Sequence, residues 1–391
     1  MITLLFDGPE RADLLPFTYI RPVAHIRLGI DRLIDKWEAA LSQKCGVFTQ
    51  DYLQKKFPHQ SAEKILFINP CFMPTHVLAN QILALKENEA LIYNAQLVAC
   101  VSLTGTPPST LEGYEQIKWT PPLLHLKQAS DLFLLNALVL EDDFIRLTKG
   151  RTSAPISKSN QVIGRENVFI EEGASVECSI LNASNGSIYI GKQAVVMEGS
   201  MLRGNLAIGD NSIVKMGTKI YGGTTLGPFS KVGGELNNVV MFGFSNKGHD
   251  GFLGNAVVGE WCNIGAATDA SNLKNNYAKI RLWNYKKESF LKTELQFCGL
   301  LMGDYSRCSI HTTFNTATVV GVSANLFGVG FPRNFIPSFS YGGAQGLSTF
   351  TFDKALESAQ AMMERKQVVL SEIDQAILAQ VFEISSQWRK A

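Results

Sequence analysis

A single histidine lies between glycines in the stretch SNKGHDGFLGNAVVGEWCN, which covers residues 245–263. Gly248 precedes His249, and Asp250 and Gly251 follow it. An imidazole titrates near neutral pH, so it can accept a proton from an attacking nucleophile. The sequence therefore makes His249 the first candidate for a catalytic general base.

The other five histidines lack this setting. His25 falls within a predicted helix, and His311 lies in a regular part of the repeat described below. The loop histidines have no acidic or cysteine neighbours at metal-ligand spacing; they are His59, His76 and His125. We therefore interpret His249 as catalytic, with a structural loop histidine as the alternative.

The seven cysteines are scattered, odd in number and form no Cys-x-x-Cys pair, which argues against a disulfide framework and a zinc site. A net charge of +1 gives no reason to expect a nucleic acid or a membrane surface as partner. There is no uncharged apolar run of about 18 residues. The first segment, MITLLFDGPERADLLPF, lacks a basic start and is typical of a strand, not a signal peptide. We expect a reduced, cytoplasmic protein without a metal.

A second stretch that can do chemistry is basic. Residues 268–297 contain six cations and three acids, and the cations are Lys274, Lys279, Arg281, Lys286, Lys287 and Lys292. Apolar and polar side chains alternate from residue 277 to 283, which predicts a projecting β-hairpin turning near 284–287. Two interpretations stay open: a solvated decoration, or a basic arm that binds phosphate on a ligand or a neighbouring subunit.

A strict period of six organises the scaffold around these residues. Every sixth residue from 190 is aliphatic: Ile190, Val196, Leu202, Ile208, Val214, Ile220, Leu226 and Val232. Amphipathic strands of an ordinary sheet would instead alternate with a period of two. A period of six indicates one short strand and one tight corner per repeat, with three repeats per triangular coil. The predicted fold is therefore mainly β, a left-handed parallel β-helix of hexapeptide repeats.

The period slips twice. It resumes out of phase with the members Val240, Phe252, Val258 and Ile264, where Asn246 stands as a missing apolar rung. It resumes again with Met302, Cys308, Phe314, Val320 and Leu326. We predict that loops leave the β-helix at the breaks, 233–251 and 265–301, and that the first of these loops carries His249.

The two ends of the chain have other patterns. Residues 1–155 are predicted to form a small α/β domain that begins with the strand MITLLFDG and an amphipathic helix over 22–41, with Pro22 at its first position. The β-helix domain is expected over 156–345. Residues 346–391 have helical periodicity without Pro, and we expect one or two capping helices there.

With the register, GHDGFLG and VVGEWCNIGA in view, the β-helix resembles the acetyltransferase half of a bifunctional bacterial enzyme of the hexapeptide-repeat acyltransferase superfamily. That enzyme is the N-acetylglucosamine-1-phosphate uridylyltransferase and glucosamine-1-phosphate N-acetyltransferase. The likeness covers roughly residues 160–335 and is strongest over 235–277. The whole chain resembles bacterial sugar nucleotidyltransferase-like proteins with a shortened N-terminal domain.

The resemblance implies roles for particular residues. His249 matches the family's general base, and Ala266 the position of a backbone amide that contacts the acetyl group. The implied substrate-binding residues are Glu235, Asn237, Phe252, Asn263, Asn272, Tyr277 and Lys279. The implied cofactor-binding residues are Ala266, Ile310 and Gly328. Ungapped counting offers Asn272 for the family's Asn-Tyr pair, and the pair Asn276-Tyr277 is the other possibility. Family members are trimers with acetyl-CoA between subunits, so the resemblance implies a homotrimer.

Two positions depart from the family pattern. Phe252 replaces a tyrosine, and Asn237 replaces a phosphate-binding lysine. An amide cannot supply the lysine's charge, so phosphate recognition is expected to shift to Lys247, Lys231 or Lys219. The N-terminal domain also lacks the glycine-rich phosphate loop of nucleotidyltransferases. In its place, Asp7 is a metal or structural candidate, while the arginines of this region, which can bind an anion, are Arg11, Arg21 and Arg27.

The sequence supports three hypotheses. The first is an acetyl-CoA-dependent N-acetyltransferase that acts on an amino-sugar-1-phosphate resembling glucosamine-1-phosphate, in nucleotide-sugar biosynthesis. The second is a sugar-1-phosphate nucleotidyltransferase, requiring Mg²⁺, in which the β-helix serves for assembly. The third is a non-catalytic sugar-phosphate-binding protein.

Overall fold

The computed structural model describes residues 1–389, which form two compact units. The N-terminal unit comprises residues 1–14, 18–26 and 31–128. The solenoid unit comprises residues 15–17, 27–30 and the chain from Ala129 onward. Across the described residues, no helix combines the length and the apolar character that a membrane span requires.

The N-terminal unit contains a six-stranded mixed sheet with the order β2-β1-β3-β5-β4-β6. Its strands are β1 (Ile2–Phe6), β2 (Gly46–Phe48), β3 (Ile65–Ile68), β4 (Glu89–Tyr93), β5 (Gln96–Ser102) and β6 (Glu115–Lys118). Its helices are α1 (Leu33–Leu41), α2 (Asp51–Gln54) and α3 (His76–Leu83), with 3₁₀ turns at Pro9–Ala12 and Val23–His25. Strand β1 pairs in parallel with both β2 and β3.

The long helix predicted over residues 22–41 is wrong in its first half. A 3₁₀ turn ends at His25, the next residues are extended, and α1 begins only at Leu33. Gly29 has φ of +72°, and a Cβ there would lie 2.4 Å from an Asp143 carboxylate oxygen. Because a left-handed glycine cannot continue a right-handed helix at this point, the apolar spacing of 22–32 reflects tertiary burial.

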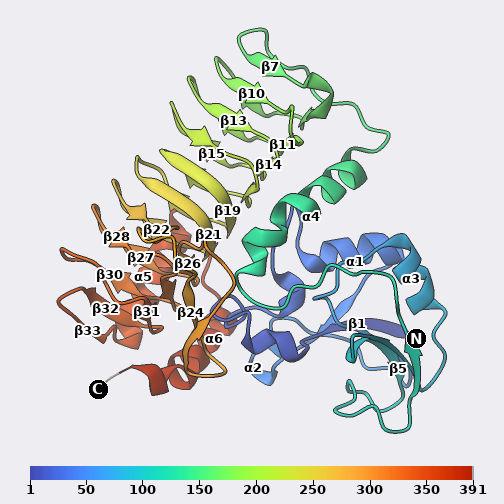
Figure 1. Cartoon of the computed structure of the whole chain (residues 1–391). Coiled ribbons are helices and arrows are strands. Elements are labelled where there is room, and N and C mark those ends of the chain that lie inside the picture. The colour runs from blue at the N-terminus through green and yellow to red at the C-terminus, as the bar shows by residue number, and fades with distance from the viewer. Residues whose placement is uncertain (390–391) are drawn as a thin grey trace. The chain divides into compact units, whose positions relative to one another are not determined.

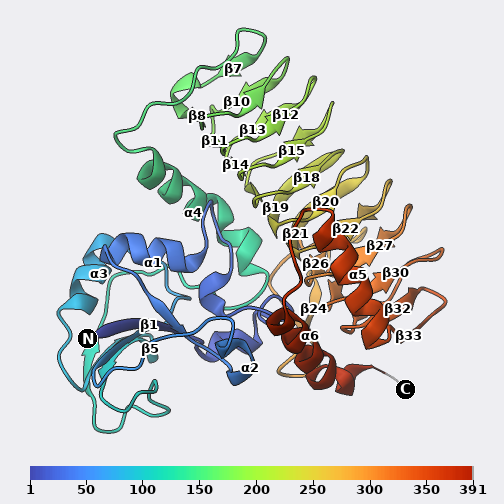
Figure 2. The ribbon, with the colours of Figure 1, turned by 180° about the vertical axis from the view of Figure 1, so that it is seen from behind.

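The solenoid unit confirms the predicted hexapeptide β-helix. Its strands stack in chain order from β7 to β33 (Figures 1 and 2), and partners in regular coils stand 18 residues apart, as Val195 and Ile213 do. Each coil has three faces. The first face consists of β7 (Gln161–Ile163), β10 (Ile180–Asn182), β13 (Met201–Arg203), β16 (Lys219–Ile220), the first halves of β19 (Glu235–Gly243) and β21 (Phe252–Glu260), β23 (Asp269–Ala270) and β28 (Thr313–Phe314).

The second and third faces complete the coil. The second face consists of β8 (Val168–Ile170), β11 (Ile188–Ile190), β14 (Leu206–Ile208), β17 (Thr224–Leu226), the second halves of β19 and β21, β26 (Leu301–Met302), β29 (Val319–Val320) and β31 (Phe335–Ile336). The third face consists of β9 (Ser175–Val176), β12 (Val195–Val196), β15 (Ile213–Val214), β18 (Lys231–Val232), β20 (Asn246–Lys247), β22 (Asn263–Ile264), β27 (Arg307–Cys308), β30 (Asn325–Leu326) and β32 (Ser340–Gly343), to which β33 (Gly346–Thr349) adds antiparallel.

The first phase slip is a shortening of the coil, so the predicted loop over 233–251 is wrong. Leu236 faces the interior below Ile220, Met241 below Leu226, and Lys247 below Val232. The corner after Val232 is therefore two residues shorter than in the regular six-residue step. The corner after Leu236 is one residue shorter. Two predicted interior positions change as a result: Val240 and Phe252 face outward, and their neighbours Met241 and Leu253 fill the core.

The second slip is the predicted projecting hairpin. Strands β24 (Arg281–Asn284) and β25 (Ser289–Lys292) pair antiparallel, with Asn284 opposite Ser289. We call residues 271–300 the arm. In the arm, the Trp283 ring stacks on the Phe335 ring with centroids 4.0 Å apart, and the Tyr285 ring contacts Trp388 edge-on with centroids 5.1 Å apart. The arm is therefore held against the last coil through aromatic contacts.

Helices cover two parts of the solenoid. Helix α4 (Asp131–Thr148) packs on the outward side chains of the second face; those in its apolar cluster are Phe169, Tyr189 and Ala207. Helices α5 (Phe352–Glu364) and α6 (Glu372–Ile384), followed by a 3₁₀ turn at Ser386–Trp388, confirm the predicted helical C-terminal segment. A further 3₁₀ turn lies at Arg165–Asn167.

The corner between the second and third faces carries aromatic residues in the left-handed region. Their φ values run from 52° to 60°, and they are Phe229, Phe244, Trp261, Tyr305 and Phe339. This conformation is costly for bulky residues. Stacking within the column offsets the cost, with ring centroids 4.4 Å apart for Phe244 and Trp261. Helices α5 and α6 cover the lower part, where Phe382 packs on Phe339 at 5.0 Å.

Replacing Trp283 by alanine should release the arm. The substitution removes the stack on Phe335, so we expect trypsin to cleave after the exposed Lys286 and Lys287 about tenfold faster than in wild type. The measurement is limited proteolysis followed by mass spectrometry. Tyr341→Ala, which removes an exposed ring of the third face, is the control and should leave this cleavage rate unchanged.

Candidate functional site

His249 lies at the corner between the third and first faces, which we call the histidine corner. Its side chain is exposed, as is that of Asp250, and none of the described residues hydrogen-bonds to the imidazole. The residues at the same place in the following coils are Ala266, Ile310 and Gly328, as the pairings of the third face require. Backbone bonds join consecutive turns, from Ala267 N to Asp250 O at 2.9 Å and from His311 N to Ala266 O at 2.8 Å. The structure thus places the candidate base and the three cofactor-binding candidates in one column.

The histidine corner exposes apolar surface below His249. The Ile310 side chain is 63% exposed and that of Val329 is 84% exposed. Single exposed apolar side chains are common on protein surfaces, but a group of them along one edge is not. Such apolar patches often mark contacts with a ligand or another protein. This edge can therefore receive an apolar chain or a neighbouring molecule.

Three substrate-binding candidates lie on the first face beside this corner. Glu235 pairs in register with Phe252 of the next coil, and Asn237 with Gly254. Lys219 lies 3.9 Å from the Glu235 carboxylate across a solvent-exposed gap, so the pair adds little stability. The structure also brings in Asp269, which sequence reasoning missed: its Oδ1 accepts the Phe252 N–H at 2.7 Å. Asp269 lies one coil below Phe252. The regular six-residue repeat does not predict this pairing, which follows from the strand register of the structure.

Asn263 lies on the third face, on the other side of the histidine corner. The outward-facing row there is polar and runs Lys231, Asn246, Asn263, Arg307, Asn325. Arg307 is half-buried, and desolvation lowers its pKa, with Cys262 acting in the opposite direction. No acid among the described residues forms an ion pair with Arg307. This row supplies two cations, Lys231 and Arg307, that the sequence pattern did not single out together.

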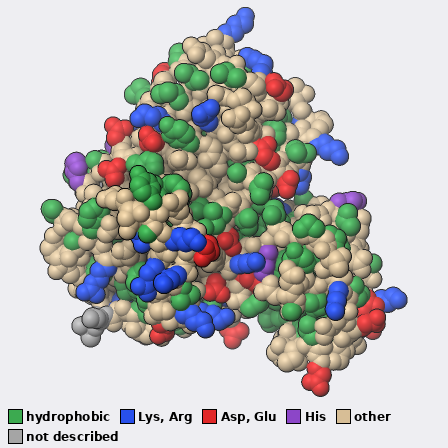
Figure 3. All heavy atoms as spheres, in the orientation of Figure 1, with side chains coloured by type: hydrophobic (Ala, Val, Ile, Leu, Met, Phe, Trp, Pro, Cys, Tyr) green, Lys and Arg blue, Asp and Glu red, His purple; other side chains and the backbone are tan. Residues whose placement is uncertain are grey.

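The remaining candidates are not beside His249 within one chain. Asn272 lies at the corner between the first and second faces, where its Nδ2 donates to Asn255 Oδ1 at 2.8 Å. Tyr277 is 67% exposed at the start of the arm, and Lys279 forms an ion pair with Glu294 inside the arm. On the side seen in Figure 3, lysine and arginine side chains gather where the arm lies in Figure 1.

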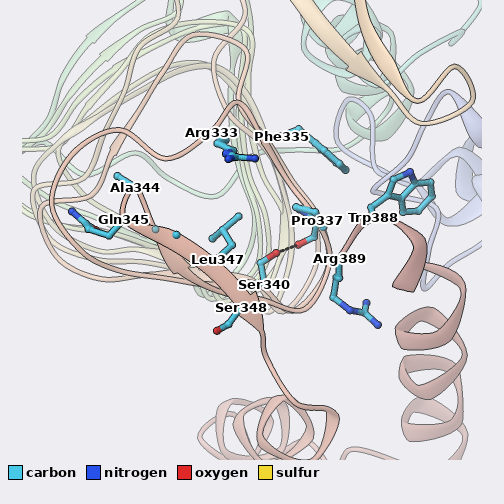
Figure 4. A pocket seen from close by; sticks show the side chains of 12 residues that line it. Arg333, Phe335, Pro337, Ser340, Ala344, Gln345, Leu347, Ser348, Trp388 and Arg389 are labelled. Atoms are coloured by element: carbon cyan, nitrogen blue, oxygen red, sulfur yellow. Dashed lines mark hydrogen bonds between the residues drawn. The ribbon is translucent and has the colours of Figure 1, made fainter. Parts of the chain in front are cut away.

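His249 does not line either of two hollows formed by described residues of the solenoid unit. A polar hollow of about 420 Å³ lies where the arm begins, lined by Ser271, Leu273, Lys274, Asn275, Asn276, Asn315, Thr316 and Asn334. A hollow of about 400 Å³ lies at the last coil. Figure 4 shows Arg333, Phe335 and Trp388 around one side of it and Ala344 and Gln345 on the other. The Arg389 guanidinium there bonds Ser385 Oγ at 2.8 Å and Phe382 O at 2.6 Å.

One buried cation stands directly beside the candidate base. The Lys247 side chain is 1% exposed and faces the solenoid interior, so this residue cannot bind substrate phosphate from solution as the sequence suggested. Asn246, the predicted missing rung, faces outward instead. Desolvation lowers the pKa of Lys247 to about 8, while Asp269, Asp250 and Cys308 act in the opposite direction.

The polar residues of the N-terminal unit are engaged with one another. Burial raises the pKa of Asp7, whose Oδ2 accepts from Arg11 at 3.0 Å and from Thr49 at 2.5 Å, and whose Oδ1 accepts from Val23 N at 2.7 Å. This set indicates the structural role for Asp7. A second buried pair, His125 Nε2 and Glu10 Oε1 at 2.7 Å, joins residues 115 positions apart, so sequence spacing could not reveal it.

No group of three or more His, Cys, Asp or Glu side chains within residues 1–389 is arranged to hold a metal ion. The seven cysteines, all within the described residues, form no disulfide bond.

A family model described as sugar nucleotidyl transferase matches residues 3–152, which is less than half of the chain. No curated protein matches the chain. Among solved structures, the Arabidopsis UDP-N-acetylglucosamine acyltransferase is 15% identical, with a TM-score of 0.21 and coverage of 61% of this chain and 99% of that one. A mutant perosamine N-acetyltransferase from Caulobacter crescentus, in complex with CoA and GDP-perosamine, is 11% identical, with a TM-score of 0.13 and coverage of 89% and 96%. The similarity to a known family is that of the N-terminal segment to sugar nucleotidyl transferases.

The buried amine of Lys247 predicts a specific pH dependence of stability. Its folded-state pKa of about 8 lies below the ordinary 10.5, so between these values the unfolded chain binds more protons. The free energy of unfolding of the wild type should therefore rise with pH across this window, relative to Lys247→Met. Urea unfolding at pH 7.5 and pH 10 measures the difference. Identical pH dependence in the two proteins would contradict a depressed amine pKa.

Proposed function

We propose that the protein is an acetyl-CoA-dependent N-acetyltransferase acting on an amino-sugar-1-phosphate such as glucosamine-1-phosphate. The observation that carries the proposal is the histidine corner, where an exposed imidazole stands in one column with Ala266, Ile310 and Gly328. The family resemblance, which covers roughly residues 160–335, assigns the same positions to base and cofactor. The N-terminal similarity to sugar nucleotidyl transferases fits a sugar-phosphate substrate.

His249 would act as general base. The sugar amine attacks the thioester carbonyl, a C–N bond forms, and the carbonyl electron pair moves to oxygen. The imidazole takes the N–H proton, because an amine that keeps it cannot form a stable amide. The tetrahedral intermediate then collapses, the C–S bond breaks, and the CoA thiolate leaves and accepts a proton from the imidazolium.

The acyl-CoA would run along the histidine corner. Coils are separated by about 4.8 Å, so Gly328 lies roughly 14 Å below His249, three coils on. The exposed Ile310 gives the pantetheine arm an apolar contact along this path. We propose that a neighbouring subunit of a homotrimer closes this edge into a groove and brings its own Tyr277 and Lys279 to the site.

Phosphate recognition would fall to the polar row of the third face. Asn237 carries no charge, and Lys219 already faces Glu235. Arg307 and Lys231 flank the asparagines Asn246 and Asn263 in the row beside the histidine corner. A guanidinium without an acid partner suits a phosphate oxygen pair.

His249→Ala should slow CoA release from acetyl-CoA and glucosamine-1-phosphate by about 10²–10⁴-fold, because the attacking amine loses its proton acceptor. The assay follows free thiol over time at saturating substrates. His76→Ala, which removes an exposed histidine of the N-terminal unit, should match wild type. Equal rates for His249→Ala and wild type would remove the imidazole from its assigned role.

A second candidate is sugar-1-phosphate nucleotidyl transfer, favoured by the match over residues 3–152. The residue set after β1 argues against it, because Asp7 is held by Arg11 and no glycine-rich loop follows.

In a thermal-shift screen we expect stabilisation by acetyl-CoA. Stabilisation by a uridine or thymidine nucleotide only with Mg²⁺, together with pyrophosphate release, would favour nucleotidyl transfer. Stabilisation by sugar phosphates alone would favour a binding protein.

A further inference from the structure

Lys247 occupies a place that the repeat reserves for aliphatic side chains. It stands in the interior column of the third face, directly between Val232 and Ile264. The side chain is 1% exposed, and the column continues with Cys308 and Leu326. Moving an amine from water into such a stack is strongly unfavourable unless its hydrogen atoms find acceptors. A specific set of acceptors must therefore hold it there.

Two backbone carbonyls supply that set. Lys247 Nζ donates to Gly233 O at 3.0 Å and to His249 O at 2.8 Å. Gly233 belongs to the shortened corner of one coil and His249 to the histidine corner of the next. The amine thus bridges two consecutive corners from inside the solenoid.

Few side chains hold the histidine corner, and its other backbone bonds lie after His249, where the Asp250 and Gly251 carbonyls accept from Ala267 N at 2.9 Å and Glu235 N at 3.1 Å. It is flanked by Gly248 and Gly251, and Gly251 has φ of +120°. The short corner above it packs backbone on backbone, since a Cβ on Gly234 would lie 2.7 Å from Gly251 O. Glycines supply this close approach but lose the side-chain contacts that would fix the loop. The carbonyl of His249 itself is held by Lys247.

We propose that Lys247 is a positioning residue whose buried amine fixes the backbone that presents the His249 imidazole. The role in catalysis rests on the proposed function, whereas the anchoring of the corner does not. A neutral amine still has two N–H groups for two carbonyls, so the anchor survives deprotonation. The titratable groups around it are Asp250 and Asp269, which are exposed at the same corner and on the first face, and the Cys308 thiol below it.

Lys247→Met is the test, because methionine keeps an unbranched apolar stem and removes the donors. We expect the amides of Glu235 and Ala267, which donate to the Gly251 and Asp250 carbonyls of the corner at 3.1 and 2.9 Å, to exchange hydrogen about tenfold faster than in wild type, by mass-spectrometric hydrogen exchange of the full chain. We also expect kcat for CoA release to fall by about 10²-fold with KM for acetyl-CoA unchanged, because misplacing a base affects the chemical step. Ile264→Met changes the next side chain of the column without touching the bridge and should alter neither quantity.

The outcomes separate the two claims. Unchanged exchange at the Glu235 and Ala267 amides in Lys247→Met overturns the proposal whatever the rate does. Faster exchange with unchanged kcat, while His249→Ala is slow, overturns the positioning role. If His249→Ala keeps full turnover, the proposed function fails, and the exchange result alone still decides whether Lys247 anchors the corner. Should Lys247→Met not fold, Lys247→Gln retains an amide donor, and slower exchange than in Lys247→Ala would support the bridge.

Discussion

The solenoid depends on interior stacking of one side chain per face and per coil. Coils about 4.8 Å apart leave no room between layers, so each interior residue contacts the one above and the one below. Val214, Val232 and Leu226 are all at most 1% exposed for this reason. Strand pairing follows the same axis, and it forces residues at equivalent corners into columns. His249, Ala266, Ile310 and Gly328 form one of these columns.

The corners between the faces accommodate residues and turns that do not fit the stacked interior. At the corner between the second and third faces, bulky aromatic residues adopt left-handed φ values and recover the cost by stacking and by burial under α5 and α6. At the histidine corner, the short turn at Gly233–Gly234 brings backbone against backbone, and a lysine fills the interior place. One corner is thus closed by apolar packing, and the other is left exposed.

The exposed corner is where the candidate site assembles. Its column joins His249 to Ala266, Ile310 and Gly328, and the two adjoining faces bring Phe252 and Asn263 to either side. The arm candidates, Tyr277 and Lys279, lie elsewhere on the same chain. A groove between copies of the chain would unite these groups, which links the proposed acetyl transfer to assembly.

The sequence by itself determined the β-helix, because the six-residue period over residues 190–232 indicates one short strand and one tight corner per repeat, with three repeats per coil. It also determined the hairpin of the arm, whose alternation survives as β24 and β25. The slip after Val232 was ambiguous, since a shortened corner and an inserted loop shift the phase alike. Only the tertiary structure decided that Met241 and Leu253, not Val240 and Phe252, face inward, and that Lys247 lies within the core. It likewise decided that residues 22–32 do not form a helix and that Glu10 meets His125. In each case the deciding contact is made with another coil or another element, and the local side-chain pattern does not encode such a contact.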